Sequence, residues 1–211
     1  MKYDPAKHHR RSIRLSGYDY SQSGFYFVTL CVQHRACLFG HIQDGQMHLN
    51  SAGLMIDRWW RKIPDKFPHV TIDAQIVMPN HYHAIITIPV GADPSVCPNP
   101  ELTPPTDPIH PIAGIIALGE RTASGEHVGS PLLAVSLGRM VQWAKTMTTN
   151  EYIRGVKRGE WQPFHKRLWQ RNYYEHIIRD EKALTNIRNY IADNPARWNR
   201  DQLHPQNPSK Y

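Results

Sequence analysis

Residues 70–88 read VTIDAQIVMPNHYHAIITI and fall into two extended segments on either side of a Pro79-Asn80 turn. Before the turn, every second residue from Val70 to Met78 is apolar, and three of the four residues between them are polar. This alternation is typical of a strand with one buried face. After the turn, residues 81–88 are predicted to form a second strand.

Three elements are predicted ahead of this pair of strands. Residues 25–32, FYFVTLCV, are apolar on both faces, as expected of a central strand. Residues 38–49 are predicted to form a hairpin, because Asp44-Gly45 divides them and favours a tight turn. A helix should follow, capped by Ser51 and stopped by Pro64. Its apolar side would carry Ile56, Trp59, Trp60 and Ile63.

The second half begins with residues 89–131, which hold nine of the 17 prolines and show little periodicity. We interpret them as an insertion or mobile loop. Ser130-Pro131 has the pattern of a helix start, and residues 173–178 are predicted to form a strand. A last helix should be capped by Asp180 and ended by Pro195, before a polar, loosely held tail at 196–211. The two helical stripes are Leu133, Leu137, Met140, Val141, Ala144 and Thr148, then Leu184, Ile187 and Ile191.

The order of these elements predicts an α+β fold in which an antiparallel sheet packs against helices, in a split-βαβ arrangement. With 211 residues and no internal repeat, residues 1–211 should form a single domain. Residues 1–20 would be a basic arm ahead of it.

Composition narrows the class of partner. The 25 Lys and Arg outnumber the 18 Asp and Glu, which gives a net charge of +7 and favours a polyanion such as nucleic acid. Cys31, Cys37 and Cys97 lack the spacing of a zinc site or a disulfide framework, so a reducing cytoplasm is expected. The sequence contains no secretory signal pattern and no run of about 20 apolar residues, so we expect no membrane association.

His81 and His83 are the first candidate site. Residues two apart in a strand point to the same face, so the two imidazoles would project together, as a pair of metal ligands must. Two hydrogen-bonded or exposed histidines at a strand end would give the same short pattern.

Tyr190 and Asn194 are the second candidate site. They are four residues apart in the last predicted helix and would share one face, from which both could reach the histidine pair. Asn194 precedes Pro195, which disfavours helical geometry and could distort the pairing. Taken alone, Tyr190 would also suit the edge of the core.

Basic and aromatic residues near both ends are candidates for DNA contacts. Residues 157–171 mix the two kinds in a way that suits single-stranded or hairpin DNA, although a solvated basic surface over buried indoles explains the mixture equally well. Tyr173 and Tyr174 should point to opposite faces of their strand. The residues proposed to contact DNA are Arg10, Arg11 and Arg14 in the arm and Lys145, Lys166, Arg167, Trp169, Arg171 and Tyr173 in the second half.

Taken together, these motifs resemble the REP-associated tyrosine transposases, a branch of the single-tyrosine HUH transposases. The resemblance covers nearly the whole chain, because its motifs occur in the family's order and spacing. They are RSIRL at 11–15, GYDY at 17–20, YFVT at 26–29, LFG at 38–40, MPNHYH at 78–83, SLG at 136–138 with Lys145, WQRNYYEHIIR at 169–179, Tyr190-Ile191 and Asn194-Pro195.

The resemblance implies a ferredoxin-like HUH nuclease fold, with His81, His83 and Asn194 as ligands of Mg²⁺ or Mn²⁺ and Tyr190 as the nucleophile. It implies cleavage and transfer of single-stranded, hairpin-forming DNA from repeated palindromic elements, through a 5′-phosphotyrosine intermediate. It also allows a homodimer. Two alternatives stay open: an HUH replication initiator or relaxase, and a domesticated DNA-binding protein without turnover.

Overall fold

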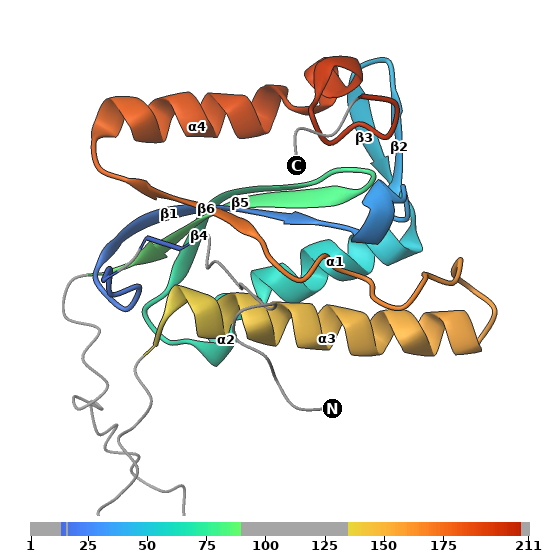
Figure 1. The fold of residues 1–211 in the computed structure, drawn as a ribbon, viewed down its shortest axis with the longest axis horizontal. Helices are drawn as coiled ribbons and strands as arrows, with labels where there is room; N and C mark the ends of the chain where they lie inside the picture. The colour runs from blue at the N-terminus through green and yellow to red at the C-terminus, as the bar shows by residue number, and fades with distance from the viewer. Residues whose placement is uncertain (1–13, 16, 90–134, 208–211) are drawn as a thin grey trace, which may run out of the picture. The chain divides into compact units, whose positions relative to one another are not determined.

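A computed structural model describes residues 14–15, 17–89 and 135–207. Within them, a four-stranded antiparallel sheet has the order β4-β5-β1-β6, and β2 and β3 form a separate hairpin (Figure 1). The strands are β1 (Gly24–Cys31), β2 (Gly40–Gln43), β3 (Gln46–Leu49), β4 (Thr71–Val77), β5 (His81–Ile88) and β6 (Tyr174–Ile178). The helices are η1 (Gln33–Arg35), α1 (Ser51–Arg61), α2 (Ile63–Lys66), α3 (Leu137–Lys157), α4 (Glu181–Asp193) and η2 (Pro195–Arg200).

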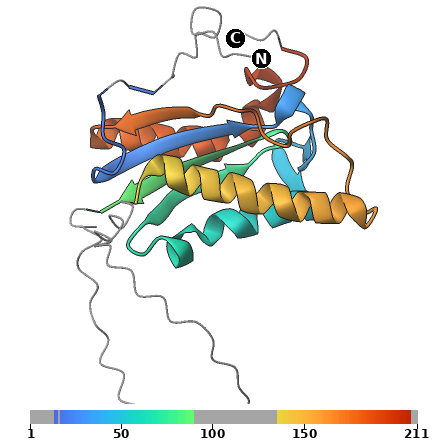
Figure 2. The same ribbon diagram turned by 60° about the horizontal axis from the view of Figure 1, so that its bottom comes forward.

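The sheet and its helices confirm the predicted α+β fold. α1 connects β1 to β4 and α3 connects β5 to β6, and in each case another strand lies between the two that are connected. This is the split-βαβ arrangement. α1 and α3 lie side by side on one face of the sheet, and α4 covers the other face (Figures 1 and 2).

Alternating side chains of β1 and β5 point to opposite faces of the sheet and pack into two separate hydrophobic cores. Tyr26 and Val28 on β1, with Tyr82 on β5, pack into the larger core beside α1 and α3. Phe27 and Ile85 pack into the smaller one beneath α4. The prediction that residues 25–32 form a central strand with two apolar faces is confirmed.

The hairpin and the ends of α1 follow local signals. Asp44 and Gly45 have φ of 51° and 72°, the positive values required at both central positions of the tightest hairpin turn. The predicted cap of α1 was wrong by one residue, because Asn50 accepts the hydrogen bond from the backbone N–H of Gly53. Ser51 instead accepts a hydrogen bond from the Trp161 indole. Pro64 does not end helical structure, because it lies inside the short helix α2 after a break at Lys62.

β4 departs from the predicted strand because a bulge lies between Ile72 and Ala74. A bulge adds a residue to one strand and shifts the alternation of faces. Ile72 therefore packs against the larger core, whereas Ala74 and Ile76 pack against the smaller one beneath α4. The predicted single apolar face of residues 70–78 was wrong for this reason.

The later helices show one further difference. α3 begins at Leu137, and Val135 and Ser136 before it are not helical, so the stripe predicted from Leu133 does not continue unbroken into α3. Ser130-Pro131 lies outside the described residues, as does the proline-rich segment apart from its first residue. Asp180 caps α4 as predicted, by accepting a hydrogen bond from the backbone N–H of Ala183. None of the helices in the described part of the chain is long and apolar enough to cross a membrane.

The segment after α4 packs against the other described residues of the chain, so the prediction of a loosely held tail was wrong for residues 196–207. Its Trp198 is buried, and the Arg35 guanidinium donates hydrogen bonds to the backbone carbonyls of Gln202, His204 and Asn207. The Asn80 amide donates another to the carbonyl of Leu203, at 2.8 Å. Residues 208–211 lie outside the described part of the chain.

Candidate active site

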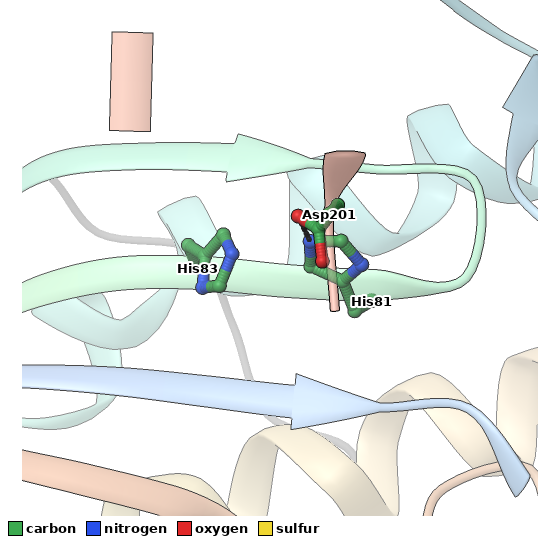
Figure 3. A group of neighbouring side chains, drawn as sticks. All are labelled: His81, His83 and Asp201. Carbon is green, nitrogen blue, oxygen red and sulfur yellow. Dashed lines mark ion pairs between the residues drawn. The ribbon is translucent and has the colours of Figure 1, made fainter. Parts of the chain in front are cut away.

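His81 and His83 lie at the start of β5 and share the face that α4 covers. Both are buried, and their ring centroids are 4.6 Å apart. They come from a strand that is hydrogen-bonded on both sides, to β4 and β1, which fixes their backbone. Figure 3 shows the two rings on one strand, with the Asp201 carboxylate beside His81. The predicted projection of both histidines to one face is confirmed.

The hydrogen bonds of Asn80 determine which nitrogen of His81 is free. The amide nitrogen of Asn80 donates to the backbone carbonyls of Arg35 and Leu203, so its oxygen is the atom that faces His81. That oxygen lies 2.8 Å from Nδ1 of His81 and accepts its hydrogen. Nε2 of His81 therefore carries the lone pair, which is the form that binds a metal.

His83 is oriented by residues from two other elements. Its Nδ1 lies 2.8 Å from the Thr29 hydroxyl on β1. Its Nε2 lies 3.4 Å from the Tyr190 hydroxyl on α4, and the two rings are 5.3 Å apart. Tyr190 is 39% exposed, so part of the residue faces solvent while its hydroxyl lies beside His83.

Asn194 is positioned one turn after Tyr190, at the end of α4. Its φ and ψ are −57° and −42°, so it remains helical before Pro195, and the predicted distortion was wrong. Its side chain is buried and close enough to His81 and Tyr190 to influence the pKa of each. Asn194 Oδ1 and His81 Nε2 are both buried without a hydrogen-bond partner among the described residues. Buried polar atoms are rarely left unsatisfied in this way unless something else binds them.

Asp201 completes the cluster from the segment after α4. One carboxylate oxygen lies 3.8 Å from Nε2 of His81, and the ligand atoms of His81, His83 and Asp201 lie within 4.8 Å of one another. This residue was not predicted from the sequence, because residues 196–211 show no periodic pattern. The signal that could have revealed it is Trp198, a large apolar residue whose burial anchors an otherwise polar segment.

Burial keeps both histidines neutral. It lowers the pKa of His81 to about 3, an effect that Asn194 only partly opposes. It also lowers the pKa of His83, with a smaller contribution from His81. The His81–Asp201 contact is therefore not an ion pair, because the ring carries no charge near neutral pH. Burial raises the pKa of Tyr190, as does the charge of Asp201, while Asn194 acts in the opposite direction.

These donor atoms fit a divalent metal ion. Two neutral imidazoles offer nitrogen, and the Asp201 carboxylate and the Asn194 amide offer oxygen. Imidazole suits transition metals, whereas carboxylate, carbonyl and water suit Mg²⁺ and Mn²⁺. The side chains converge from β5, α4 and the segment that follows α4.

Three of the predicted DNA-binding residues, Arg14, Lys145 and Tyr173, lie together on the α3 side of the sheet. The Arg14 guanidinium donates a hydrogen bond to the Tyr173 hydroxyl, at 2.8 Å, and lies 3.8 Å from the Glu175 carboxylate. The Lys145 ammonium donates to the backbone carbonyls of Gln170 and Arg171, and burial lowers its pKa to about 8. Each of the three side chains is therefore engaged within the protein. Arg10 and Arg11 lie outside the described residues.

The other predicted DNA-binding residues divide into exposed and buried ones. Lys166, Arg167 and Arg171 are exposed, so they can meet a ligand. Trp169 is buried, and its indole donates a hydrogen bond to the Thr148 hydroxyl. The expectation that Trp169 contacts DNA is therefore corrected: its ring belongs to the core beside Phe39. Tyr174 is exposed on the opposite face from Tyr173, as predicted.

Comparison with known proteins identifies a relative. No family model matches the chain. An uncharacterized protein of Haemophilus influenzae is 38% identical over 208 residues, which cover 96% of this chain and 97% of that protein. The chain belongs to the same family as this protein.

Two solved structures show weaker similarity. One is a REP-associated tyrosine transposase bound to a REP hairpin, 17% identical, with a TM-score of 0.49 over 94% of this chain and 91% of that one. The other is a proposed transposase from Deinococcus radiodurans, 13% identical, with a TM-score of 0.42 over 86% of this chain and 97% of that one. Since both TM-scores are below 0.5, the function of this protein has to be inferred from its own residues.

Proposed function

We propose that this protein is a metal-dependent endonuclease and transposase that cuts single-stranded DNA with Tyr190 as its nucleophile. The observation that carries the proposal is the position of the Tyr190 hydroxyl, which lies 3.4 Å from Nε2 of His83 and close to Asn194 and Asp201. The resemblance of the sequence motifs to the single-tyrosine HUH transposases gives the same roles to Tyr190 and the histidine pair.

The ion would be held by the two imidazoles of His81 and His83, the Asn194 amide oxygen and the Asp201 carboxylate. The resemblance implies the first three of these ligands, and Asp201 is added by the structure. One carboxylate among four ligands leaves a divalent ion with a net positive charge, and such an ion neutralises and polarises a phosphate. Because two of the donors are imidazoles, we expect Mn²⁺ to bind more tightly than Mg²⁺.

The chain's own residues then account for the covalent step. The Tyr190 oxygen forms a bond to phosphorus, and the bond between phosphorus and the 3′ oxygen of the preceding nucleotide breaks. Tyr190 loses its phenol proton in this step and the leaving 3′ oxygen gains one, so the number of protons is unchanged. The products are a 5′-phosphotyrosine and a free 3′-hydroxyl. Since the phosphodiester energy is kept in the new link, rejoining to another strand needs no ATP.

The expected substrate is a single strand that folds into a hairpin, from repeated palindromic elements. The net charge of +7 supports a polyanionic partner, and the exposed edge of Tyr190 supports access by a strand from solvent. The resemblance supports the palindromic source.

A gel assay tests the proposal. A hairpin oligonucleotide labelled at its 3′ end is incubated with the protein and Mn²⁺, and the products are separated under denaturing conditions. We expect the label to migrate with the protein, and a 5′-labelled oligonucleotide to give only a shorter free strand. The absence of both cleavage and adduct with Mn²⁺ and Mg²⁺, on hairpins from the repeats that flank the gene, would contradict the proposal.

Asn80→Ala is expected to weaken Mn²⁺ binding roughly 10–100-fold, because partners that orient a ligating histidine contribute about that much. The matched control is Asn50→Ala, which also removes an asparagine amide with two backbone hydrogen bonds but lies at the start of α1. Calorimetric titration with Mn²⁺ measures both. Equal affinities in the two variants would show that the Asn80–His81 contact does not tune the site.

A double variant with Arg10→Ala and Arg11→Ala is expected to weaken DNA binding. The slope of the logarithm of the binding constant against the logarithm of salt concentration should also fall, by about 0.7 for each phosphate of a single strand that the variant no longer neutralises. Arg14→Ala should instead lower thermal stability, because Arg14 is bonded to Tyr173. The charge-matched control is Arg58→Ala with Arg61→Ala, which pair with Glu151 and Asp57. If the arm and control variants give the same slope, the arm does not contact DNA.

A further inference from the structure

A small basic pocket lies outside the cluster around Tyr190. It has a volume of about 260 Å³ and forms where η1, just after β1, meets the segment that leads to Trp169. All five of its lining side chains carry hydrogen-bond donors, and none is a carboxylate. They are Gln33, His34, His165, Lys166 and Arg167.

Backbone hydrogen bonds fix the walls of this pocket. The N–H of Gln33 donates to the carbonyl of Leu168, and the N–H of Gln170 donates to the carbonyl of Cys31, both at 2.8 Å. Val32 and Trp169 form a bridge between these bonds. The two segments are therefore joined as a short antiparallel pair, so the charged side chains stand on a rigid base although they are exposed.

The backbone of the pocket is strained. Of the five non-glycine residues with positive φ in the described part of the chain, three lie at this pocket or next to it. They are His34 at 59°, Arg35 at 55° and Lys166 at 59°. Side chains disfavour this conformation, and such strain gathers at binding and catalytic sites, where other contacts hold it in place. His34 and Lys166 both line the pocket.

A short chain of hydrogen bonds links the pocket to the candidate metal ligands. The carbonyl of Arg35, next to His34, accepts a hydrogen bond from the Asn80 amide, at 2.9 Å. The oxygen of the same amide accepts the Nδ1 hydrogen of His81. The pocket and the candidate metal ligands therefore lie at the same end of the sheet, where the end of β1 pairs with the start of β5.

We propose that this pocket binds a phosphate of the same DNA strand, other than the one that Tyr190 attacks, and so holds the strand in register for cleavage. Arg167 and Lys166 supply charge, and the imidazoles of His34 and His165 supply additional N–H donors, a combination suited to phosphate oxygens. This proposal rests on the proposed function, because it takes the ligand to be the DNA that Tyr190 cuts.

The test measures binding separately from cleavage. The variants are made in a Tyr190→Phe background, and binding of a single-stranded hairpin oligonucleotide is measured in chelator over a range of salt concentrations. His165→Ala with Arg167→Ala should weaken binding about tenfold or more, since hydrogen bonds to charged groups are among the stronger ones. The salt slope should fall by about 0.7 for each phosphate that is no longer neutralised. The matched control is His69→Ala with Arg61→Ala, the same residue types beside α2.

A second readout reports on the pocket itself. The imidazole proton signals of His34 and His165, assigned from the single variants, should shift in NMR spectra when the oligonucleotide is added. If the pocket and control variants bind DNA with the same affinity and slope, the proposal is overturned. Shifts with inorganic phosphate but not with DNA would reduce the pocket to a small-anion site and overturn it too. The two proposals can fail separately. If the pocket variant loses DNA binding while the wild-type protein binds DNA without cutting it, the phosphate-binding pocket is supported and the proposed nuclease activity is contradicted.

Discussion

Tyr190→Phe is expected to abolish the covalent protein–DNA adduct completely and to leave DNA binding within about twofold of wild type. The substitution removes the one oxygen proposed to attack phosphorus, and no other group at that position can form the phosphoester. The fold should tolerate the change, because Tyr190 is partly exposed and its hydrogen bond with His83 is long, at 3.4 Å. Denaturing gels measure the adduct, and fluorescence anisotropy measures binding.

Two other tyrosines provide the controls. Tyr174→Phe changes an exposed tyrosine whose ring lies near Phe27 on the same face of the sheet, and Tyr173→Phe changes the partner of Arg14. Both should retain the adduct. If Tyr190→Phe still forms the adduct in full and one of the two controls loses it, the nucleophile is the tyrosine changed in that control.

Replacing either histidine of the pair is expected to have an effect of the same size. His81→Ala or His83→Ala should eliminate cleavage and weaken Mn²⁺ binding at least 100-fold, because each removes one of the two nitrogen donors. Asp201→Asn should also weaken Mn²⁺ binding strongly, since it keeps the shape of the side chain and removes the only negative charge in the cluster. Asn194→Ala should have a smaller effect, because a neutral amide oxygen is lost.

Circular dichroism checks that these variants fold, and His41→Ala, on the exposed hairpin, controls for histidine loss as such. Calorimetry with Mn²⁺ gives the affinities. Full cleavage by the double variant of His81 and His83 in the presence of chelator would rule out a metal at this site. Wild-type Mn²⁺ affinity in Asp201→Asn would limit the ligands to those predicted from the sequence.

Local periodicity explains what could be predicted from the sequence. The period of two in β5 puts His81 and His83 on one face, and the spacing of four in α4 aligns Tyr190 with Asn194. Neither pattern contains the distance between the two elements, so the residues alone allowed Tyr190 to reach the histidine pair without requiring it, and the resemblance gave it that role. The split-βαβ order could be predicted because strands and helices alternate with clear turn signals.

The features that escaped prediction depend on contacts between distant residues. The bulge in β4 leaves the apolar alternation of residues 70–78 intact, so the sequence hides the change of face at Asp73. Asp201 is far from His81 in sequence and reaches it because hydrogen bonds from the Arg35 guanidinium and the Asn80 amide, together with the burial of Trp198, hold its segment in place. Trp169 was equally ambiguous, since basic neighbours in sequence do not reveal that its ring turns inward.

The identity of the nucleophile is tested most directly by mass spectrometry of the adduct. Wild-type protein is allowed to react with the hairpin oligonucleotide and Mn²⁺, the DNA is trimmed with nuclease, and the protein is digested with trypsin. Cleavage after Arg188 and Arg197 releases peptide 189–197, whose single tyrosine is Tyr190, and cleavage after Arg171 and Arg179 releases peptide 172–179 with Tyr173 and Tyr174. We predict that peptide 189–197 carries the mass of a 5′-linked nucleotide on Tyr190. A nucleotide found on peptide 172–179, with 189–197 unmodified, would contradict the assignment.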